Sequence, residues 1–205
     1  ITLDGTNQHY STVSAVAVGT NASWTIEGWM KRNDGVTGNE VFMELKPSSG
    51  NANRVWVNID SDDVQLLIWS NSGSGGEITT VGAGLNDGKW HHIAWTHDVS
   101  EADGSKIYVD GGLDGQTELN QPAGSDAGTN VDFVIGGASY LHYDEIRIYN
   151  DIRTEDEIRD NMWANIATDT AGLLGYYKCE DINTTFTDSV SSGGENGTLG
   201  SASYV

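Results

Sequence analysis

The chain has 205 residues, with 30 Asp and Glu against 10 Lys and Arg, and its formal net charge is −20 at pH 7. This balance argues against a nucleic-acid partner, because contacts with phosphates need Lys and Arg. No apolar run approaches the roughly 18 residues of a membrane-spanning helix, and the single cysteine, Cys179, permits no internal disulfide. A chain of this length is expected to form one domain, residues 1–205, and its 7 Trp and 8 Tyr argue against disorder.

Short runs rich in Val, Ile, Thr, Trp and Tyr follow one another along the chain. Gly accounts for 26 residues and Pro for two, and Asp-Gly dipeptides, which favour hairpin turns, recur between the runs. Strands are therefore predicted at residues 23–31, 54–59, 64–69, 90–97, 106–109, 131–135, 145–149 and 173–179.

Side chains alternate in character along two of these predicted strands. In residues 54–59 the odd-numbered positions are Val, Val and Ile, and the even-numbered positions are Arg, Trp and Asn. In residues 145–149 the even-numbered positions are Ile, and the odd-numbered ones are Glu, Arg and Tyr. Strands with one apolar and one polar-aromatic face are typical of an antiparallel sandwich, so the predicted class is all-β with two sheets.

One helix is predicted, from residue 155 to about residue 166. Thr154 is its expected N-cap, and Glu157 completes a capping box with it. The acidic first turn suits the positive end of the helix dipole. The stripe that would dock the helix on the sandwich follows at i, i+4 and i+8, and is formed by Ile158, Met162 and Ile166.

Several longer stretches resemble a known superfamily. They are NDGKWHHIAW at 86–95 with KIYVDG at 106–111, YDEIRIYN at 143–150 with the helix that follows, and the segment at 171–199. With the opening ITLDGTNQHY and WTIEGWM at 24–30, they resemble the laminin G-like, pentraxin-like branch of the concanavalin A-like lectin/glucanase superfamily. The resemblance covers nearly the whole chain and implies a two-sheet antiparallel jelly roll. Because the chain opens at Ile1 without a Met, we expect it to be part of a larger protein with flanking domains.

The resemblance also implies a structural calcium ion (Ca2+). Its ligands would come from the Asp that opens the DEIRIY strand and from the Asp-Gly turn of the first strand, here Asp144, Asp4 and Gly5. Calcium takes oxygen ligands from carboxylates and backbone carbonyls, and a Gly lets the backbone approach closely. The alternative is that Asp144 caps a turn and Asp4 is exposed. The acidic residues at 60–63 and 98–103 are weaker metal candidates.

The superfamily includes glycoside hydrolases, which in the retaining class need two carboxylates about 5–5.5 Å apart. The glucanases that the chain resembles carry them on one strand as Glu-x-Asp-x-Glu, and no predicted strand here has such a run. Glu27 and Glu145 are isolated strand carboxylates and are expected to pair with Lys31 and Arg147. No catalytic residue is therefore assigned.

The sequence WHH at 90–92 is interpreted as structural. Adjacent residues of a strand point to opposite faces, so His91 and His92 are not expected to share a metal ion. The tryptophans expected to serve packing are Trp24, Trp90, Trp95 and Trp163.

Tryptophans on polar strand faces are the candidates for a ligand site. Sugar recognition needs a flat apolar surface for the pyranose face, with polar groups beside it. Trp56 and Trp69 lie on neighbouring predicted strands, and Arg54 and Asn58 share a face with Trp56, so these four are the predicted ligand residues. Trp29 is a further candidate. The alternative is that Trp56 and Trp69 are core residues.

These patterns predict a non-catalytic, extracellular ligand-binding module that is stabilised by calcium and binds a glycan or another cell-surface ligand. The alternative is a structural spacer or protein–protein adhesion domain of a surface or fibre protein, with the same fold and no sugar site. A glycoside hydrolase stands third. The fold alone does not choose between these functions, because function depends on the sites that a fold carries.

Overall fold

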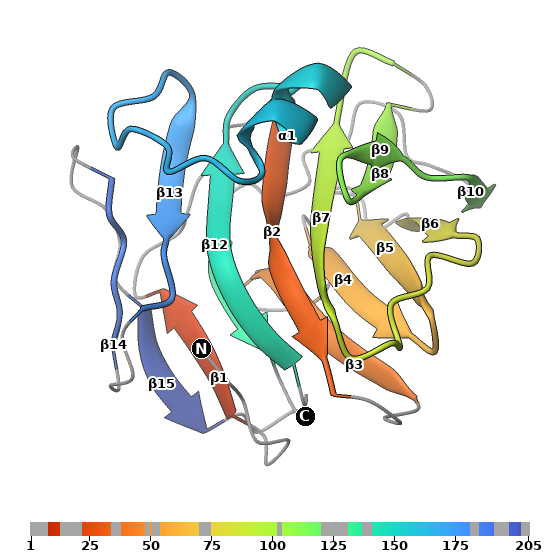
Figure 1. The fold of residues 1–205 in the computed structure, drawn as a ribbon, viewed down its shortest axis with the longest axis horizontal. Coiled ribbons are helices and arrows are strands. Elements are labelled where there is room, and N and C mark those ends of the chain that lie inside the picture. The colour runs from red at the N-terminus through yellow and green to blue at the C-terminus, as the bar shows by residue number, and fades with distance from the viewer. Residues whose placement is uncertain are drawn as a thin grey trace.

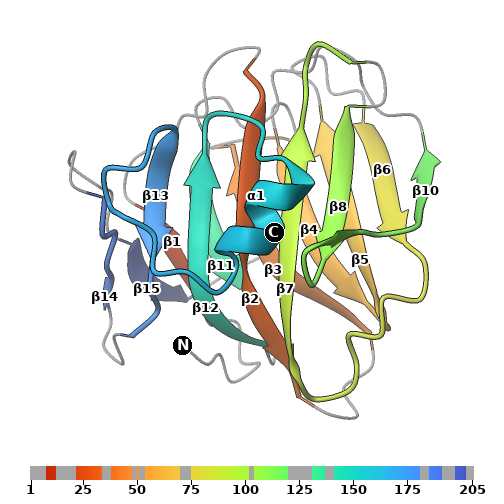
Figure 2. The same cartoon turned by 45° about the horizontal axis from the view of Figure 1, so that its top comes forward.

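Two antiparallel sheets packed face to face make up the molecule (Figures 1 and 2). The computed structural model describes residues 8–12, 22–33, 38–47, 50, 54–69, 75–101, 104–119, 131–136, 141–180, 185–190 and 197–201. Within these residues, the larger sheet has nine strands in the order β10-β6-β5-β4-β3-β11-β1-β15-β14, and the smaller has six in the order β13-β12-β2-β7-β8-β9. The predicted all-β, two-sheet antiparallel sandwich is confirmed.

The strands of the larger sheet are β1 (Gln8–Thr12), β3 (Asn39–Lys46), β4 (Val55–Asp60), β5 (Asp63–Trp69), β6 (Gly75–Thr80), β10 (Gln116–Leu119), β11 (Asp132–Gly136), β14 (Thr185–Phe186) and β15 (Gly197–Ser201). Those of the smaller sheet are β2 (Trp24–Arg32), β7 (Trp90–His97), β8 (Ser105–Val109), β9 (Gly112–Leu113), β12 (Leu141–Tyr149) and β13 (Leu173–Tyr177). Strand β3 had no predicted counterpart. Its register with β4 shifts between Val41 and Met43, so that Phe42 and Met43 are both buried and the period of two is lost.

The hydrophobic core lies between the sheets. Phe42 of β3 reaches across to the smaller sheet, where its ring centroid lies 5.4 Å from that of Trp95 and 5.2 Å from that of Tyr143. The alternation predicted for β4 and β12 is confirmed, because the core includes Val55, Val57, Ile59, Ile146 and Ile148. The other faces of the two sheets point away from the core and are called the outer faces below.

Helix α1 (Glu155–Asn161) lies on the outer face of the smaller sheet, where Ile158 packs with Ala94 and Tyr108 (Figures 1 and 2). The predicted capping box is confirmed: Thr154 Oγ1 accepts from the Glu157 amide at 3.2 Å, and Glu157 Oε2 accepts from the Thr154 amide at 2.8 Å. In the described part of the chain no helix is long and apolar enough to cross a membrane.

The predicted end of this helix is wrong, because α1 stops at Asn161 and not near residue 166. Side chains of the sheet bind the backbone of the next turn. Arg147 donates to the carbonyls of Asn161 and Ala164, and Trp29 Nε1 donates to the carbonyl of Met162. These tertiary hydrogen bonds hold the segment after α1 against the sheet in a non-helical course.

Candidate functional site

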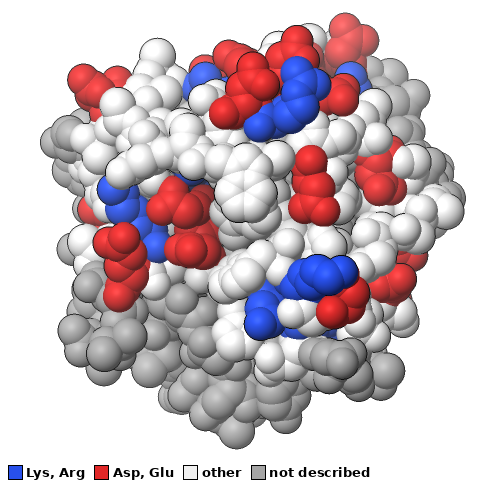
Figure 3. Space-filling model, viewed as in Figure 1, with Lys and Arg blue, Asp and Glu red and all other residues white. Residues whose placement is uncertain are grey.

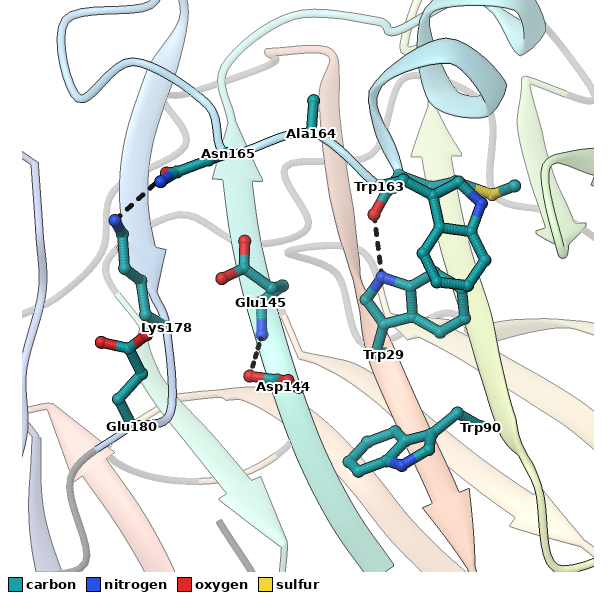
Figure 4. A pocket seen from close by; sticks show the side chains of 10 residues that line it. Trp29, Trp90, Asp144, Glu145, Trp163, Ala164, Asn165, Lys178 and Glu180 are labelled. Carbon is teal, nitrogen blue, oxygen red and sulfur yellow. Dashed lines mark hydrogen bonds between the residues drawn. The ribbon is translucent and has the colours of Figure 1, made fainter.

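A pocket of about 480 Å³ opens on the outer face of the smaller sheet, beside the segment that follows α1 (Figure 4). It is lined by residues of β2, β7 and β12 and of the segments after α1 and β13, namely Trp29, Trp90, Asp144, Glu145, Met162, Trp163, Ala164, Asn165, Lys178 and Glu180. Figure 4 shows three indole rings on one side and the charged and amide side chains on the other. This is a concave site with apolar walls and a few polar groups.

The aromatic side of the pocket combines exposure with close contact. Trp163 is 76% exposed and Trp90 is 43% exposed, whereas Trp29 beneath them is 8% exposed. The ring centroids of Trp29 and Trp163 are 4.2 Å apart, and Trp29 Nε1 donates to the Met162 carbonyl at 2.8 Å. Trp163 is therefore largely exposed to solvent and rests against a buried ring that is itself held by a hydrogen bond.

The prediction that Trp90 and Trp163 serve packing is wrong for both residues. Trp90 is the first residue of β7 and falls on the outer face with His92, at the end of the sheet. Trp163 lies beyond the true end of α1, so it does not sit beside a helical stripe. The sequence did contain one sign against burial of Trp163: it does not belong to the apolar stripe formed by Ile158, Met162 and Ile166.

A β-bulge in β12 brings two consecutive carboxylates to the pocket. Asp144 pairs with Trp29 of β2 and Arg147 pairs with Glu27, and the register shifts between these pairs. Glu145 at the bulge has φ of +50°, the left-handed region that few non-Gly residues adopt. In a regular strand Asp144 and Glu145 would point to opposite faces, so strand alternation could not have predicted that they share one site.

The bulge also explains the glycine opposite it. A Cβ at Gly28 would lie 2.9 Å from Cγ1 and 3.2 Å from Cα of Ile146. The bulged strand therefore approaches β2 so closely that position 28 has no room for a side chain.

Glu145 is held in place by two donors that act on the same oxygen. Arg147 Nη2 donates to Glu145 Oε2 at 2.9 Å, and the Tyr176 hydroxyl donates to Oε2 as well. Burial and the bond to Glu145 raise the pKa of Tyr176 to about 12, so this hydroxyl keeps its proton at neutral pH. The Glu145 side chain remains 26% exposed toward the pocket.

Arg147 connects the pocket to a buried ionic cluster. Its side chain is 1% exposed, and Nη1 lies 3.0 Å from Oε1 of buried Glu27. It also donates to the carbonyls of Asn161 at 2.9 Å and Ala164 at 2.7 Å. The predicted pairing of Glu145 with Arg147 is confirmed, whereas that of Glu27 with Lys31 is wrong. Residues four apart on a strand are separated by about 13 Å, so Arg147 across the sheet is the nearer cation.

Charged groups complete the other side of the pocket. Lys178 Nζ donates to Asn165 Oδ1 at 3.1 Å and lies 5.3 Å from the centroid of the Tyr176 ring. Asp144, Glu145 and Glu180 contribute three carboxylates. Figure 3 shows acidic and basic side chains gathered over β12 and β13, beside the hollow, and a second mixed group over α1.

The predicted ligand residues on the other sheet come together in part. Trp56 and Asn58 lie at alternate positions on the outer face of β4, Arg54 directly precedes this strand, and Trp69 ends neighbouring β5. The Trp56 and Trp69 rings are stacked with centroids 6.5 Å apart, and Arg54 Cζ lies 4.3 Å from the Trp56 centroid and 5.7 Å from that of Trp69. The Arg54 guanidinium, paired with buried Glu44 at 2.8 Å, thus covers these rings. Neither indole belongs to the hydrophobic core cluster.

Asn58 has a different setting from the other three. It is 2% exposed, and its Nδ2 donates to Gln65 Oε1 at 3.2 Å. Whether this second group of residues binds a ligand stays a prediction.

The predicted calcium ligands are described only in part, because Asp4 and Gly5 lie outside the described residues. Asp144 is half-buried, and burial together with the neighbouring Glu145 raises the pKa of its carboxyl group. Among the described residues no group of three His, Cys, Asp or Glu side chains is placed to hold a metal ion. The calcium ion therefore stays a prediction.

The weaker metal candidates have structural partners. Asp62 Oδ1 accepts from the Asn86 amide at 2.8 Å, and Asp63 Oδ1 accepts from the Ala83 amide at 3.0 Å. Asp98 Oδ1 accepts from the Ser100 amide at 2.9 Å, and Asp103 lies outside the described residues. The carboxylates of Asp62, Asp63 and Asp98 thus hold nearby backbone amides.

Neighbouring His91 and His92 contact different partners. The ring nitrogens of His91 lie 3.0 Å from Asp110 and 3.1 Å from Asp87. His92 is 1% exposed on its side chain and lies edge-on to Trp29, and burial lowers its pKa to about 3. The expectation that the two side chains point apart agrees with these contacts.

Comparison with known proteins identifies the family. The model of the concanavalin A-like lectin/glucanases superfamily matches residues 4–159, about three quarters of the chain. The protein therefore belongs to this superfamily, and the resemblance noted in its sequence is confirmed. No curated protein matches the chain significantly.

Solved structures share the fold at low sequence identity. A candidate carbohydrate-binding protein from Bacteroides ovatus ATCC 8483 is 22% identical with a TM-score of 0.68, and the match covers 94% of this chain and 56% of that one. The binding domain of botulinum neurotoxin serotype C1 is 15% identical with a TM-score of 0.54, over 72% of this chain and 37% of that one. The binding domain of serotype D is 10% identical with a TM-score of 0.57, over 78% and 43%. The chain thus spans about half the length of these proteins or less.

Proposed function

We propose that the protein is a non-catalytic carbohydrate-binding module whose ligand site is the pocket on the smaller sheet. In this proposal the Trp163 ring receives the face of a pyranose, Trp90 and Trp29 widen the apolar wall, and Glu145 and Asp144 accept hydrogen bonds from sugar hydroxyls. The proposed setting is extracellular or at a cell surface, where glycans are accessible, and within a longer chain.

The observation that carries the proposal is the position of Trp163. Trp163 is 76% exposed and lines the pocket together with Trp90, and an exposed apolar patch of this kind is typical of a binding site. The Trp163 ring lies against Trp29 and lines the same pocket as an oriented carboxylate. An apolar ring face beside fixed acceptors matches the two faces of a sugar, which is apolar on its C–H side and polar at its rim.

The solved structures add support of a general kind. One is a candidate carbohydrate-binding protein. Another is botulinum neurotoxin type C, whose cell entry is described as dependent on interaction with two ganglioside molecules. Both proteins contain this fold as part of a longer chain, and both are described as interacting with a carbohydrate or a glycolipid.

A broad glycan array, run once in calcium and once in chelator with folding checked in both, tests the proposal. Binding to at least one glycan family is the expected result. A blank array from folded protein would overturn the proposal and favour a spacer or protein-adhesion domain.

We also propose that calcium stabilises the domain through Asp144. The half-buried carboxylate fits a cation, because no described Lys, Arg or His forms an ion pair with it and Glu145 adds a second negative charge nearby. Asp4 and Gly5 would complete the site, and the ion would supply positive charge to these oxygens.

Melting temperatures measured in excess calcium and in chelator test this second proposal. A ligand at a hundred times its Kd stabilises by about 2.7 kcal/mol, which raises the melting temperature of a chain of this size by about 5–10 °C. The Asp144→Asn variant is expected to lose this increase. An unchanged melting temperature of the parent protein would count against a calcium site.

A further inference from the structure

We propose that Glu145 restricts the pocket to glycans that offer hydrogen-bond donors and carry no negative charge. Neutral hexose chains and amino sugars belong to this class, whereas uronates, sialosides and sulfated sugars do not. The inference rests on the proposed function and names the ligand class of the same site.

The geometry of Glu145 leaves one oxygen for the ligand. Arg147 and Tyr176 both donate to Oε2, and within the described residues no donor is recorded at Oε1. The side chain is partly exposed and lines the pocket, and Figure 4 shows its carboxylate in the space between Lys178 and the tryptophans. Oε1 can only accept, so the group that meets it must be a hydroxyl or an amine.

Carboxylates outnumber cations among the described residues that line the pocket. The two terminal nitrogens of Arg147, whose side chain is 1% exposed, donate to four acceptors in the described structure. Lys178, the one cation among the described lining residues, donates one of its three N–H groups to the neutral amide of Asn165 and keeps its charge. Glu180 adds a second carboxylate to the lining, and Asp144 adds a third when it holds no calcium ion. An anionic ligand would therefore meet like charges and acceptors, which is unfavourable in a concave site.

Paired oligosaccharides measure this selectivity directly. The pairs are oligomers of glucose and glucuronate, of galactose and galacturonate, and of mannose and mannuronate, together with a galactoside and its sialylated and sulfated forms. In each pair that binds, the neutral member is expected to bind at least 30-fold more tightly in 50 mM salt with chelator present, so that no calcium ion at Asp144 adds positive charge. The ratio of the two affinities should fall in 1 M salt, because charges are then screened beyond about 3 Å.

The Glu145→Gln variant gives a sharper prediction. Because Arg147 and Tyr176 both donate to the Oε2 position, the amide oxygen of Gln will occupy it and the NH2 group will face the pocket. The acceptor toward the ligand thus becomes a donor. Neutral glycans are expected to bind at least tenfold more weakly, and anionic members should gain affinity, so that the selectivity narrows or reverses.

Two further variants keep the test independent of folding. Glu180→Gln removes a charge from an exposed residue of the pocket and is expected to narrow the selectivity severalfold. Asp60→Asn is the matched control, because it also removes one negative charge from an exposed residue, at the end of β4 on the larger sheet. This variant is expected to keep the parent's selectivity for neutral glycans. Melting temperatures of all three variants show whether they fold.

The outcomes separate the two proposals. A blank array from folded protein overturns the proposed function, and the ligand class with it. Parent protein that binds anionic members as tightly as their neutral counterparts overturns the ligand class alone. The same conclusion follows if folded Glu145→Gln and Glu180→Gln retain the parent selectivity.

Discussion

Trp163→Ala is expected to weaken glycan binding by about 30-fold or more while the domain stays folded. The substitution removes the exposed ring of the pocket, and aromatic residues at the centre of a binding site typically contribute about 2 kcal/mol or more, which is about a 30-fold loss of affinity. Because Trp163 is 76% exposed, its removal creates no internal cavity. The lost contact with Trp29 is worth about 1 kcal/mol, and the melting temperature should fall by only about 2–4 °C.

The matched control is Trp69→Ala, which removes an indole from the stack with Trp56 and Arg54 on the larger sheet. Titration calorimetry, or quenching of tryptophan fluorescence by the best glycan of the array, measures both variants against the parent. Undiminished binding by Trp163→Ala would exclude the pocket as the ligand site. If Trp69→Ala alone lost binding, the ligand site would lie on the larger sheet, as the alternation in β4 originally predicted.

The fold could be predicted because its determinants are local. The alternation of Val55, Val57 and Ile59 with polar residues, and the recurrence of Asp-Gly turns, are visible within windows of a few residues. The capping box of Thr154 and Glu157 spans four residues and was equally accessible. Each of these features is decided by neighbours in sequence, and the structure agrees with them.

The pocket could not be predicted because contacts distant in sequence create it. The end of α1 depends on Arg147, which is 14 residues before Asn161, and on Trp29, which is 133 residues before Met162. The shared face of Asp144 and Glu145 depends on a bulge that strand periodicity does not encode. Without these contacts, a longer helix places Trp163 in the interior, and alternation places the two carboxylates on opposite faces. The sequence nevertheless contained the correct residue types, since Trp29, Asp144 and the pairing of Glu145 with Arg147 were all noted.

Arg147→Met is expected to cause the largest loss of stability of any single substitution considered for this protein. Arg147 neutralises Glu27, whose side chain is 2% exposed and whose pKa is raised by burial even in the presence of the guanidinium. Removing one partner of a buried ion pair costs about 3–5 kcal/mol, because the other charge is left unpaired. The carbonyls of Asn161 and Ala164 lose their donors as well, at about 1 kcal/mol or more each if water does not replace them.

A loss of at least about 4 kcal/mol is a large part of the 5–15 kcal/mol that stabilises a typical domain, and it should lower the melting temperature by about 10–15 °C. Urea unfolding of the variant and the parent measures it. The control is Arg159→Met, whose guanidinium pairs with Asp156 at the surface, with side chains 48% and 79% exposed, and whose loss should cost less than about 1 kcal/mol.

The pH dependence separates loss of this charge pair from a general loss of packing. A carboxyl group whose pKa is raised by folding contributes stability that is present below its unfolded pKa and is lost as the pH rises through its folded pKa. Without Arg147 the pKa of Glu27 rises further, so the difference in stability between parent and variant should be smaller at pH 5 than at pH 8. The double variant Glu27→Gln/Arg147→Met, which removes the unpaired charge, should recover part of the loss at pH 8. Two results together would contradict the role of Arg147 as the partner that keeps Glu27 ionised. The loss of stability in Arg147→Met would be equal at pH 5 and pH 8, and the added Glu27→Gln substitution would not reduce it.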